Sequence, residues 1–279
     1  MAKRSEKYQK NTKKSWVIAG SISLLVLVLA GVAFLIVPKV ESQATSKPSA
    51  NSKASSVVDK SSVSSNESSS PSVAAVAPSA ITLITENNQT FAVQNGQKLT
   101  GEQTVAGNTY YFDPTTAAEV GQLRPMTGNY WQESTMLQPY PDLSKYSNLS
   151  FHVSISQNRT YLESNGQVIY VFYSSTGEDQ YGGTPTGTYQ IDNYRAPSFY
   201  SASEAEGANN SVGININENP GLYLFHSVPV DSTGAYIVAN GELLGKAKAS
   251  HGCIHLSVAD SKWVYDQQFP AGTPVVIAN

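Results

Sequence analysis

The stretch from Trp16 to Val37 restricts this chain more than any other feature of its sequence, because it holds 22 residues without a single charge. With a helical rise of about 1.5 Å per residue it would span roughly 33 Å, enough to cross a hydrocarbon core of about 30 Å. Six basic side chains and one glutamate precede it, an imbalance that holds the N-terminus in the cytoplasm. We therefore expect a basic cytoplasmic tail over 1–15, a single-pass membrane anchor over 16–37, and the rest of the chain outside the cell.

A cleaved signal peptide is the alternative interpretation of the same stretch. The apolar part of a signal peptide is usually about 7–15 residues long and ends at a site of small residues. The present run is longer and leads into Pro-Lys-Val-Glu over 38–41, which contains no small-x-small pattern. The uncleaved anchor is favoured, and export of the remainder follows in both cases.

Residues 38–80 are predicted to form a stalk without a folded core. Over 41–80 there is no aromatic residue, no Leu and no Ile, and 15 of the 40 positions are Ser. Such a segment cannot bury enough apolar surface to offset the entropy of ordering it. As a Ser-rich coil it would span on the order of 35 Å, so a domain attached to it could act at a distance from the membrane.

Charge argues against nucleic acid as a partner. The first 14 residues carry a net charge of +5, so the remainder carries −8 of the total of −3. Outside the basic tail there is no cluster of Lys and Arg, and a nucleic-acid-binding surface needs one.

Residues 81–124 are predicted to form small β-hairpins. Alternating apolar residues surround turns expected at Asn95-Gly96 and Gly107-Asn108. The pattern "NGQ…TG…GNTYYFD…G" resembles about one and a half copies of the repeats of Gram-positive cell-wall-binding modules. A small β extension packed on the following domain explains it equally well. Residues 125–147 carry three prolines and are expected to be a connector with one short helix.

Residues 148–279 are long enough for a domain with its own core. Seven runs bounded by Gly, Pro, Asn or Ser resemble strands: "LSFHVSI", "RTYLE", "QVIYVFYSS", "GTYQID", "GLYLFHS", "AYIVAN" and "PVVIA". One helix is expected after Ser257, which would cap it with Asp260 at the third helical position, and Pro270 would end it. The fold class is therefore mainly β, a sandwich or a barrel.

The single cysteine, Cys253, cannot close an intramolecular disulfide. Three interpretations of Cys253 remain: a buried side chain that fills the core, a metal ligand, or a nucleophile. Burial as filler is common for cysteine, but here Ser-His-Gly precedes the thiol, and Lys246 and Lys248 lie close by in the chain. Such a polar, cationic turn favours a thiolate.

A metal site would use the alternating His251, Cys253 and His255. In an extended strand the two histidine Cα atoms would lie about 13 Å apart. Zinc needs its donors at roughly 2.0–2.3 Å from one centre, so the site would require a turn at Gly252. We disfavour this interpretation but leave it open.

A nucleophile requires a base and donors for the oxyanion. His226 in "YLFHSVP" is the best base, because it ends an apolar strand from which its ring can project. The backbone N–H groups of Gly252 and Cys253 lie where an oxyanion would form. His251 is expected to line the site, and His152, in an alternating strand, to be structural.

These residues lead to a family. "SHGCIHL" with the upstream "FHS" closely resembles the signature of L,D-transpeptidases of the YkuD type. "VFYSSTG", "GGTPTGTYQI", "LLGKAKASHGC" and "GTPVVI" are also similar to segments of that family, so the resemblance covers roughly 149–279. Two departures stand out. His255 occupies a position that is usually Asn or Arg, and the loop between the base and the "SHGC" motif is long.

The resemblance implies a β-sandwich that acts on the peptide stems of peptidoglycan without a cofactor. Cys253 would attack the carbonyl before the terminal D-Ala of a tetrapeptide stem, with His226 as base and acid. Ser227 would orient the His226 ring, through its backbone carbonyl, and Ser250 and His255 would contact substrate. An amine of a second stem would then resolve the thioester and form a cross-link.

Two other functions remain open. An L,D-carboxypeptidase would use water in place of the amine, with the same nucleophile and base. A wall-binding protein with an inactive centre would not be acylated at all.

Overall fold

The computed structural model describes residues 79–217 and 221–279. The predicted tail, anchor and stalk over 1–80 therefore lie almost entirely outside the described residues. Within the described part, no helix is both long and apolar enough to cross a membrane. The anchor at 16–37 stays a prediction from sequence.

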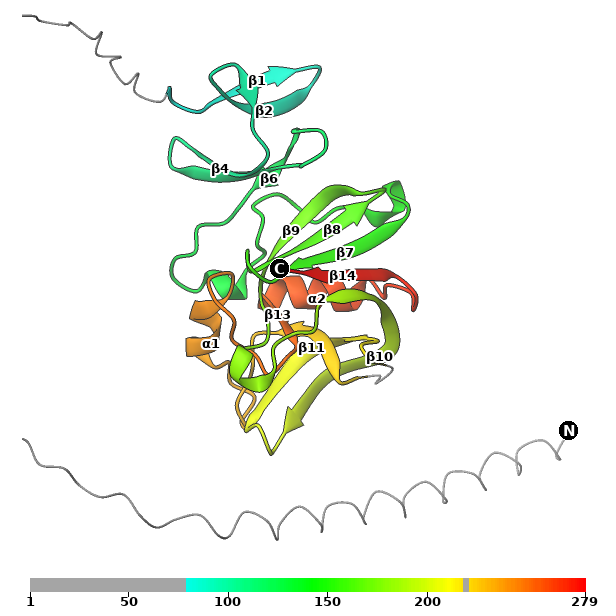
Figure 1. The fold of residues 1–279 in the computed structure, drawn as a ribbon. Coiled ribbons are helices and arrows are strands. Elements are labelled where there is room, and N and C mark those ends of the chain that lie inside the picture. The colour runs from blue at the N-terminus through cyan, green and yellow to red at the C-terminus, as the bar shows by residue number, and fades with distance from the viewer. Residues whose placement is uncertain (1–78, 218–220) are drawn as a thin grey trace, which may run out of the picture. The chain divides into compact units, whose positions relative to one another are not determined.

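Eight strands close into a barrel in the order β10-β11-β12-β13-β9-β8-β7-β14 (Figure 1). Their bounds are β7 Leu149–Ser154, β8 Arg159–Ser164, β9 Gln167–Ser175, β10 Gly187–Ser201, β11 Glu206–Ile214, β12 Tyr223–Ser227, β13 Ile254–Leu256 and β14 Pro274–Ala278. The prediction of a mainly β fold is confirmed. The sandwich is corrected to a barrel, because the long strands β9 and β10 pair with partners on both halves and join the two sheets.

Five of the predicted strand runs match β7, β8, β9, β12 and β14 closely, and a sixth matches the start of β10. The seventh, 235–240, is wrong: helix α1 (Val238–Leu243) begins within it. A Cβ at Gly241 of this helix would lie 2.5 Å from the Trp131 ring, so the helix is pressed against that side chain. This tertiary contact, rather than the local alternation of apolar residues, decides the structure there.

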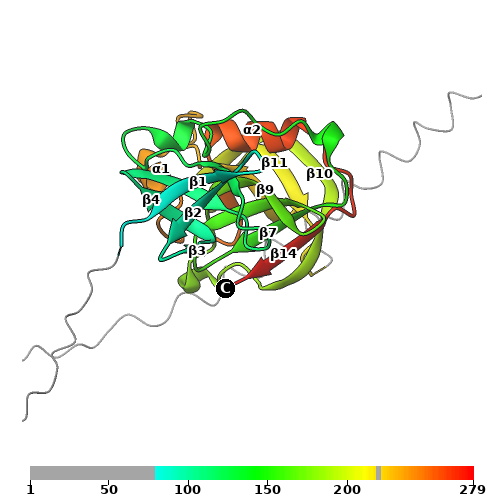
Figure 2. The same cartoon turned by 90° about the horizontal axis from the view of Figure 1, so that it is seen from above.

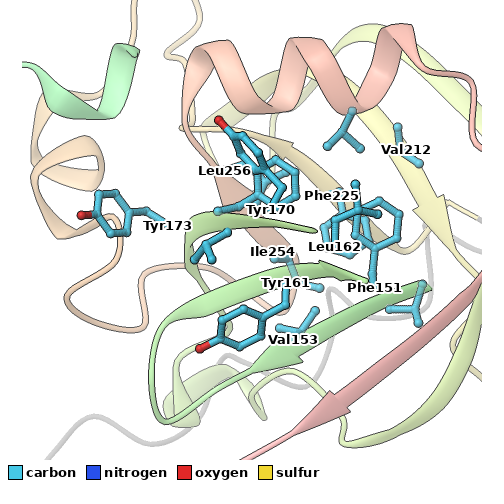
Figure 3. Close-up of a cluster of buried hydrophobic side chains, with 14 of the residues drawn as sticks. Phe151, Val153, Tyr161, Leu162, Tyr170, Tyr173, Val212, Phe225, Ile254 and Leu256 are labelled. Carbon is cyan, nitrogen blue, oxygen red and sulfur yellow. The ribbon is translucent and has the colours of Figure 1, made fainter. Parts of the chain in front are cut away.

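The barrel interior holds a continuous apolar core. Figure 3 shows Phe151 and Leu162 meeting Phe225 between the strands and a helix. The Phe151 and Phe225 ring centroids are 5.2 Å apart, and all three side chains are no more than 1 % exposed. This core fixes the strands that carry the candidate site residues.

Helix α2 (Val258–Asp266) lies against β11 and β12 (Figure 2). Its predicted cap is confirmed, because Ser257 Oγ accepts a 2.9 Å hydrogen bond from the N–H of Asp260. The helix ends before Pro270, as expected. It holds the segment after Cys253 firmly in place, since β13 leads directly into it.

Residues 81–124 form two small sheets, as predicted. The strands are β1 Thr82–Glu86, β2 Gln89–Gln94 and β3 Gln97–Lys98 in one, and β4 Gly101–Val105, β5 Asn108–Phe112 and β6 Glu119–Gln122 in the other. Asn95 and Gly96 both have positive φ, as a two-residue hairpin turn requires. The second predicted turn is shifted by one residue, to Ala106-Gly107, and Asn108 already belongs to β5.

The second small sheet is attached to the barrel through polar contacts. Glu102 receives a 2.5 Å bond from Arg159 Nε, and Asp113 accepts a 2.8 Å bond from the N–H of Val168. A packed β extension therefore describes this sheet. The likeness of the hairpins to cell-wall-binding repeats stays a prediction from sequence.

The connector 125–147 is more structured than its composition indicated. It holds two short 3₁₀ helices, η1 (Tyr130–Gln132) and η2 (Leu143–Lys145). Thr135 Oγ1 and Tyr140 Oη donate bonds of 2.6 and 2.8 Å to the buried carboxylate of Asp260 in α2. Burial raises the pKa of Asp260 to about 6, against the opposing effect of these donors. The connector thus braces the helix that follows the candidate site.

Candidate active site

Cys253 lies in a turn that leads into β13 and is one of the residues that line a small pocket. Its side chain is partly exposed, and the pocket has a volume of about 110 Å³. The lining residues are Phe199, Ser201, Glu204, Glu206, Gly207, His226, Pro229, Ser250, His251, Cys253 and His255. The fold therefore brings together the thiol and the three histidines that the sequence analysis associated with it.

The hydroxyl of Ser250 organises the turn before the thiol. Ser250 Oγ accepts a 3.1 Å bond from the Gly252 N–H and donates a 2.6 Å bond to the Cys253 carbonyl. Gly252 has φ +141°, a conformation that L side chains rarely adopt. Ser250 was expected to contact substrate. In the structure its hydroxyl makes both of these hydrogen bonds within the turn. The Gly252 N–H, expected to bind the oxyanion, is directed at Ser250 instead.

Two residues from the "STG" and "TPTG" segments hold this turn from the other side, and they were given no role from sequence. The Gly177 N–H donates to Thr184 Oγ1, which donates in turn to the Gly252 carbonyl, each over 2.8 Å. A Cβ at Gly177 would lie only 2.8 Å from the Gly252 Cα. The two motifs could have marked Gly177 and Thr184 as site residues. The contact between them is visible only in the tertiary structure.

We expect Thr184→Val to weaken both the fold and the reactivity of the thiol. The substitution keeps the shape but leaves the Gly177 N–H and the Gly252 carbonyl without a buried partner, which costs about 1–3 kcal/mol for each group left unpaired. Denaturant unfolding and the rate of thiol acylation measure the two effects. Thr184→Ser keeps the hydroxyl and should restore most of both; a Val variant with unchanged acylation would show that the contact is not needed.

His226 lies on β12 with its ring held by its neighbour. Its Nδ1 is 2.7 Å from the backbone carbonyl of Ser227, so Nδ1 carries the proton and Nε2 keeps the lone pair. The Ser227 hydroxyl donates to the Val228 carbonyl and accepts from the Asn209 N–H. The expected contact between Ser227 and the His226 ring is thus made by the Ser227 backbone carbonyl. The Ser227 side chain instead links β12 to β11 through its bond with Asn209.

Burial sets the charge state of this pair. It lowers the pKa of His226 to about 4 and raises the pKa of Cys253 to about 11. A neutral thiol and a neutral imidazole are therefore the resting forms at pH 7. The sequence analysis expected Lys246 and Lys248 to favour a thiolate at Cys253. The structure corrects this expectation, because Lys248 pairs with Asp179 at 2.5 Å and Lys246 lies over the Tyr130 ring.

His255 is paired with His226 across the parallel strands β12 and β13, with ring centroids 4.9 Å apart. It is 2 % exposed, and its buried Nδ1 makes no hydrogen bond within the described part of the chain. Burial, and then the neighbouring His226 and His251, hold its pKa well below the ordinary value. His255 therefore lines the pocket as a neutral ring, and its contact with substrate stays a prediction.

His251 lies at the pocket mouth and touches two carboxylates. Its Nε2 is 3.2 Å from Glu204 Oε2, its Nδ1 is 3.7 Å from Glu206 Oε2, and its ring packs on Tyr181 with centroids 4.1 Å apart. Both glutamates come from the β10–β11 hairpin. Sequence reasoning missed them, because nothing in "SASEAEGANN" marks a site.

Comparison with known proteins now decides the family. Residues 148–277 match the sequence model of the YkuD family, described as the L,D-transpeptidase catalytic domain. A Bacillus subtilis protein named "Putative L,D-transpeptidase YciB" is 38 % identical over 141 residues, which are 50 % of this chain and 70 % of that protein. The chain belongs to the L,D-transpeptidase (YkuD) family.

Solved structures of L,D-transpeptidases are also similar. One from Mycobacterium smegmatis is 16 % identical, with a TM-score of 0.38, and the match covers 73 % of this chain and 80 % of that one. L,D-transpeptidase 3 from Mycobacterium tuberculosis, in complex with a faropenem-derived adduct, is 24 % identical with a TM-score of 0.36. That match covers 47 % of this chain and 60 % of the other.

In this L,D-transpeptidase domain the two histidines of the metal interpretation, His251 and His255, contact different partners. His251 is directed to Glu204 and Glu206, whereas His255 lies beside His226. Within 79–217 and 221–279, no three His, Cys, Asp or Glu side chains are arranged to hold a metal ion. His152, expected to be structural, lies 3.5 Å from Glu163 on the neighbouring strand β8, away from the pocket.

Proposed function

We propose that this protein is a peptidoglycan L,D-transpeptidase that forms cross-links by acyl transfer through Cys253. The observation that carries the proposal is the placement of Cys253 and His226 on one pocket, with the base held in a defined tautomer by Ser227. Family membership supports the reaction class, a cysteine-dependent acyl transfer. The donor is a tetrapeptide stem and the leaving group is its terminal D-Ala.

The first step starts from the neutral pair. As the sulfur attacks the carbonyl carbon before D-Ala, His226 Nε2 takes the thiol proton, so the imidazolium and the oxyanion form together. The Cys253 N–H is the turn donor that we assign to the oxyanion, since the Gly252 N–H points to Ser250 Oγ. His226 then protonates the leaving amine, D-Ala departs, and a thioester on Cys253 remains.

The second step transfers the acyl group to an amine of another stem. The amine attacks the thioester carbonyl, the C–S bond breaks, and the proton lost by the amine returns to sulfur through His226. The complete reaction breaks one amide bond and forms another, so its energy balance is close to even and neither a nucleotide nor a cofactor takes part.

Isolated tetrapeptide stems test the proposal. We expect the purified protein to give cross-linked dimers and free D-Ala, detected by mass spectrometry, with Cys253→Ala as the control. Tripeptide without dimer would identify an L,D-carboxypeptidase instead. Failure of Cys253 to be acylated by either a stem or a carbapenem would identify a wall-binding protein with an inactive centre.

We further propose that the domain works outside the cell, tethered by residues 16–37 and separated from the membrane by the serine-rich stretch. The support comes from the sequence: the uncharged run, the basic residues before it and the composition of 41–80. The full-length protein should fractionate with membranes, and protease added outside intact cells stripped of wall should release a fragment of about 200 residues. A mature secreted form that begins near residue 40 would support the signal peptide instead.

A further inference from the structure

A second pocket lies on the connector and shares no lining residue with the pocket of Cys253. It has a volume of about 320 Å³ and is lined by Arg124, Pro125, Thr127, Asn129, Tyr130 and Glu133. Its side chains offer guanidinium, hydroxyl and amide donors against a single carboxylate. Such a set of donors suits an anion.

Arg124 is held so that the charged end of its side chain stays available. Its Nε donates a 2.8 Å bond to the Ser134 carbonyl, and its own carbonyl accepts a 2.6 Å bond from Tyr173 Oη. Over 79–217 and 221–279 its two Nη groups make no hydrogen bond and no ion pair. A guanidinium fixed in this way loses little conformational freedom when it binds an oxyanion through its Nη groups.

Lys246 brings a second cation to the same pocket. Its Nζ lies 4.8 Å from the centroid of the Tyr130 ring, and Tyr130 is one of the pocket residues. Tyr130 Oη donates a 2.7 Å bond to the Leu244 carbonyl, which ties the segment of Lys246 to the connector. One cation thus lines the pocket while the other lies over its tyrosine.

The two cations differ from the other basic residues in the described part of the chain. Of the eight Lys and Arg side chains there, five make ion pairs with carboxylates. Arg195 instead donates to three backbone carbonyls. The two that remain are Arg124 and Lys246. In a chain that carries −8 beyond its first 14 residues, two uncompensated cations at one pocket indicate an anion-binding surface.

We propose that this connector pocket binds a phosphate group of an anionic polymer. A tetrahedral phosphate presents oxygens in several directions, so one oxygen can meet the Nη groups of Arg124 and another the ammonium of Lys246. A planar carboxylate would be satisfied by one guanidinium edge alone. The serine-rich stretch is predicted to separate the domain from the membrane, which favours a polymer over lipid headgroups as the source of the phosphate.

The inference concerns binding and does not depend on the reaction proposed for Cys253. Because the two pockets share no residue, the domain can be held on a polymer while the thiol stays accessible. The connector pocket would then position the enzyme along a phosphate-bearing polymer without taking part in the chemistry.

NMR of the arginine side chains of the full-length protein in detergent tests the inference. The chain holds four arginines, and the Nε–H signal that is lost in Arg124→Gln identifies Arg124. We expect this signal to shift with inorganic phosphate and to saturate at concentrations on the order of 1 mM. The signals of Arg159 and Arg195 should stay in place, because their guanidinium groups are already engaged within the protein.

Three further variants give effects of different sign. Lys246→Gln should weaken phosphate binding about twofold to fivefold, as expected for an exposed charge interaction. Glu133→Gln should strengthen it by a similar factor, because it removes the only carboxylate that lines the pocket. Lys262→Gln, an exposed cation of α2 that pairs with Asp266, is the matched control and should leave binding unchanged.

The choice of anion gives the outcomes that overturn the inference. An equal response of the Arg124 signal to sodium acetate or sodium chloride at matched ionic strength would mean that the pocket senses only general screening. Unchanged phosphate affinity in both Lys246→Gln and Glu133→Gln would also overturn it. Polyphosphate should act at a lower concentration of phosphate units than phosphatidylglycerol in the micelle. The reverse order would identify a lipid headgroup and overturn the assignment to a polymer.

Discussion

Replacement of Cys253 by alanine is expected to abolish acyl-enzyme formation and cross-linking completely. Cys253 is the only thiol in the chain, so no other side chain can carry the thioester. Intact-protein mass spectrometry after incubation with the donor stem shows the added acyl mass on the wild type and none on the variant. The thermal midpoint should change little, because the substitution removes a single sulfur atom.

Cys253→Ser is expected to be nearly inactive as well. A hydroxyl is much harder to deprotonate than a thiol, and His226, whose pKa burial lowers to about 4, is too weak a base to make up the difference. Measurable acylation of the alanine variant, or wild-type rates for the serine variant, would refute the assignment of Cys253 as nucleophile.

Loss of His226 is expected to have the second largest effect. His226→Ala should slow acylation by the roughly 10²–10⁴-fold typical of lost acid–base catalysis. Stopped-flow acylation by a carbapenem, with the thermal midpoint as a check on folding, measures it. Because the ring is 4 % exposed and its removal leaves a cavity, His226→Gln, which fills more of the space, provides the second variant.

The other two histidines serve as comparisons in the same measurement. His251→Ala should be severe but incomplete, since it disturbs the thiol turn and the contacts with Glu204 and Glu206. His255→Asn, which restores the usual family residue, should cost little. Equal losses for all three together with inactivation by a chelator would favour the metal interpretation and contradict ours.

The pH dependence of acylation gives a further check on His226. Since its folded pKa is about 4, the imidazole is neutral and able to accept a proton at any pH above that value. The rate should therefore fall only as the pH drops through about 4, not through the ordinary histidine range near 6.5. An acid limb near 6.5 would mean that the base is protonated much more readily than its burial implies.

The strands that could be predicted are those whose own residues carry the signal. β9 was predicted to the residue, because "QVIYVFYSS" is a long apolar and aromatic run that ends in small polar residues. β11 was missed, since "EGANNSVGI" has the composition of a loop. It is a strand because β10 and β12 pair with it on both sides, a condition that its own sequence does not express.

The same division holds for the connector. Its three prolines indicated an irregular segment, and most of it is irregular. Its burial could not be anticipated, because the partner of Thr135 and Tyr140 is Asp260, more than a hundred residues away. Hydrogen bonds at such separation are decided by topology, and local composition carries no information about them.

For the candidate site, the sequence by itself determined which reactive groups are present: one thiol, four histidines, and a glycine beside the thiol. It also determined the family resemblance, because short motifs keep their residue types and spacing. Only the tertiary structure decided the charge state of Cys253 and His226, since burial depends on everything packed around them. It alone directed the Gly252 N–H to Ser250 and brought Glu204 and Glu206 to the pocket mouth. Electrostatics and hydrogen bonding act through space, and spatial proximity between distant segments is what a linear pattern does not contain.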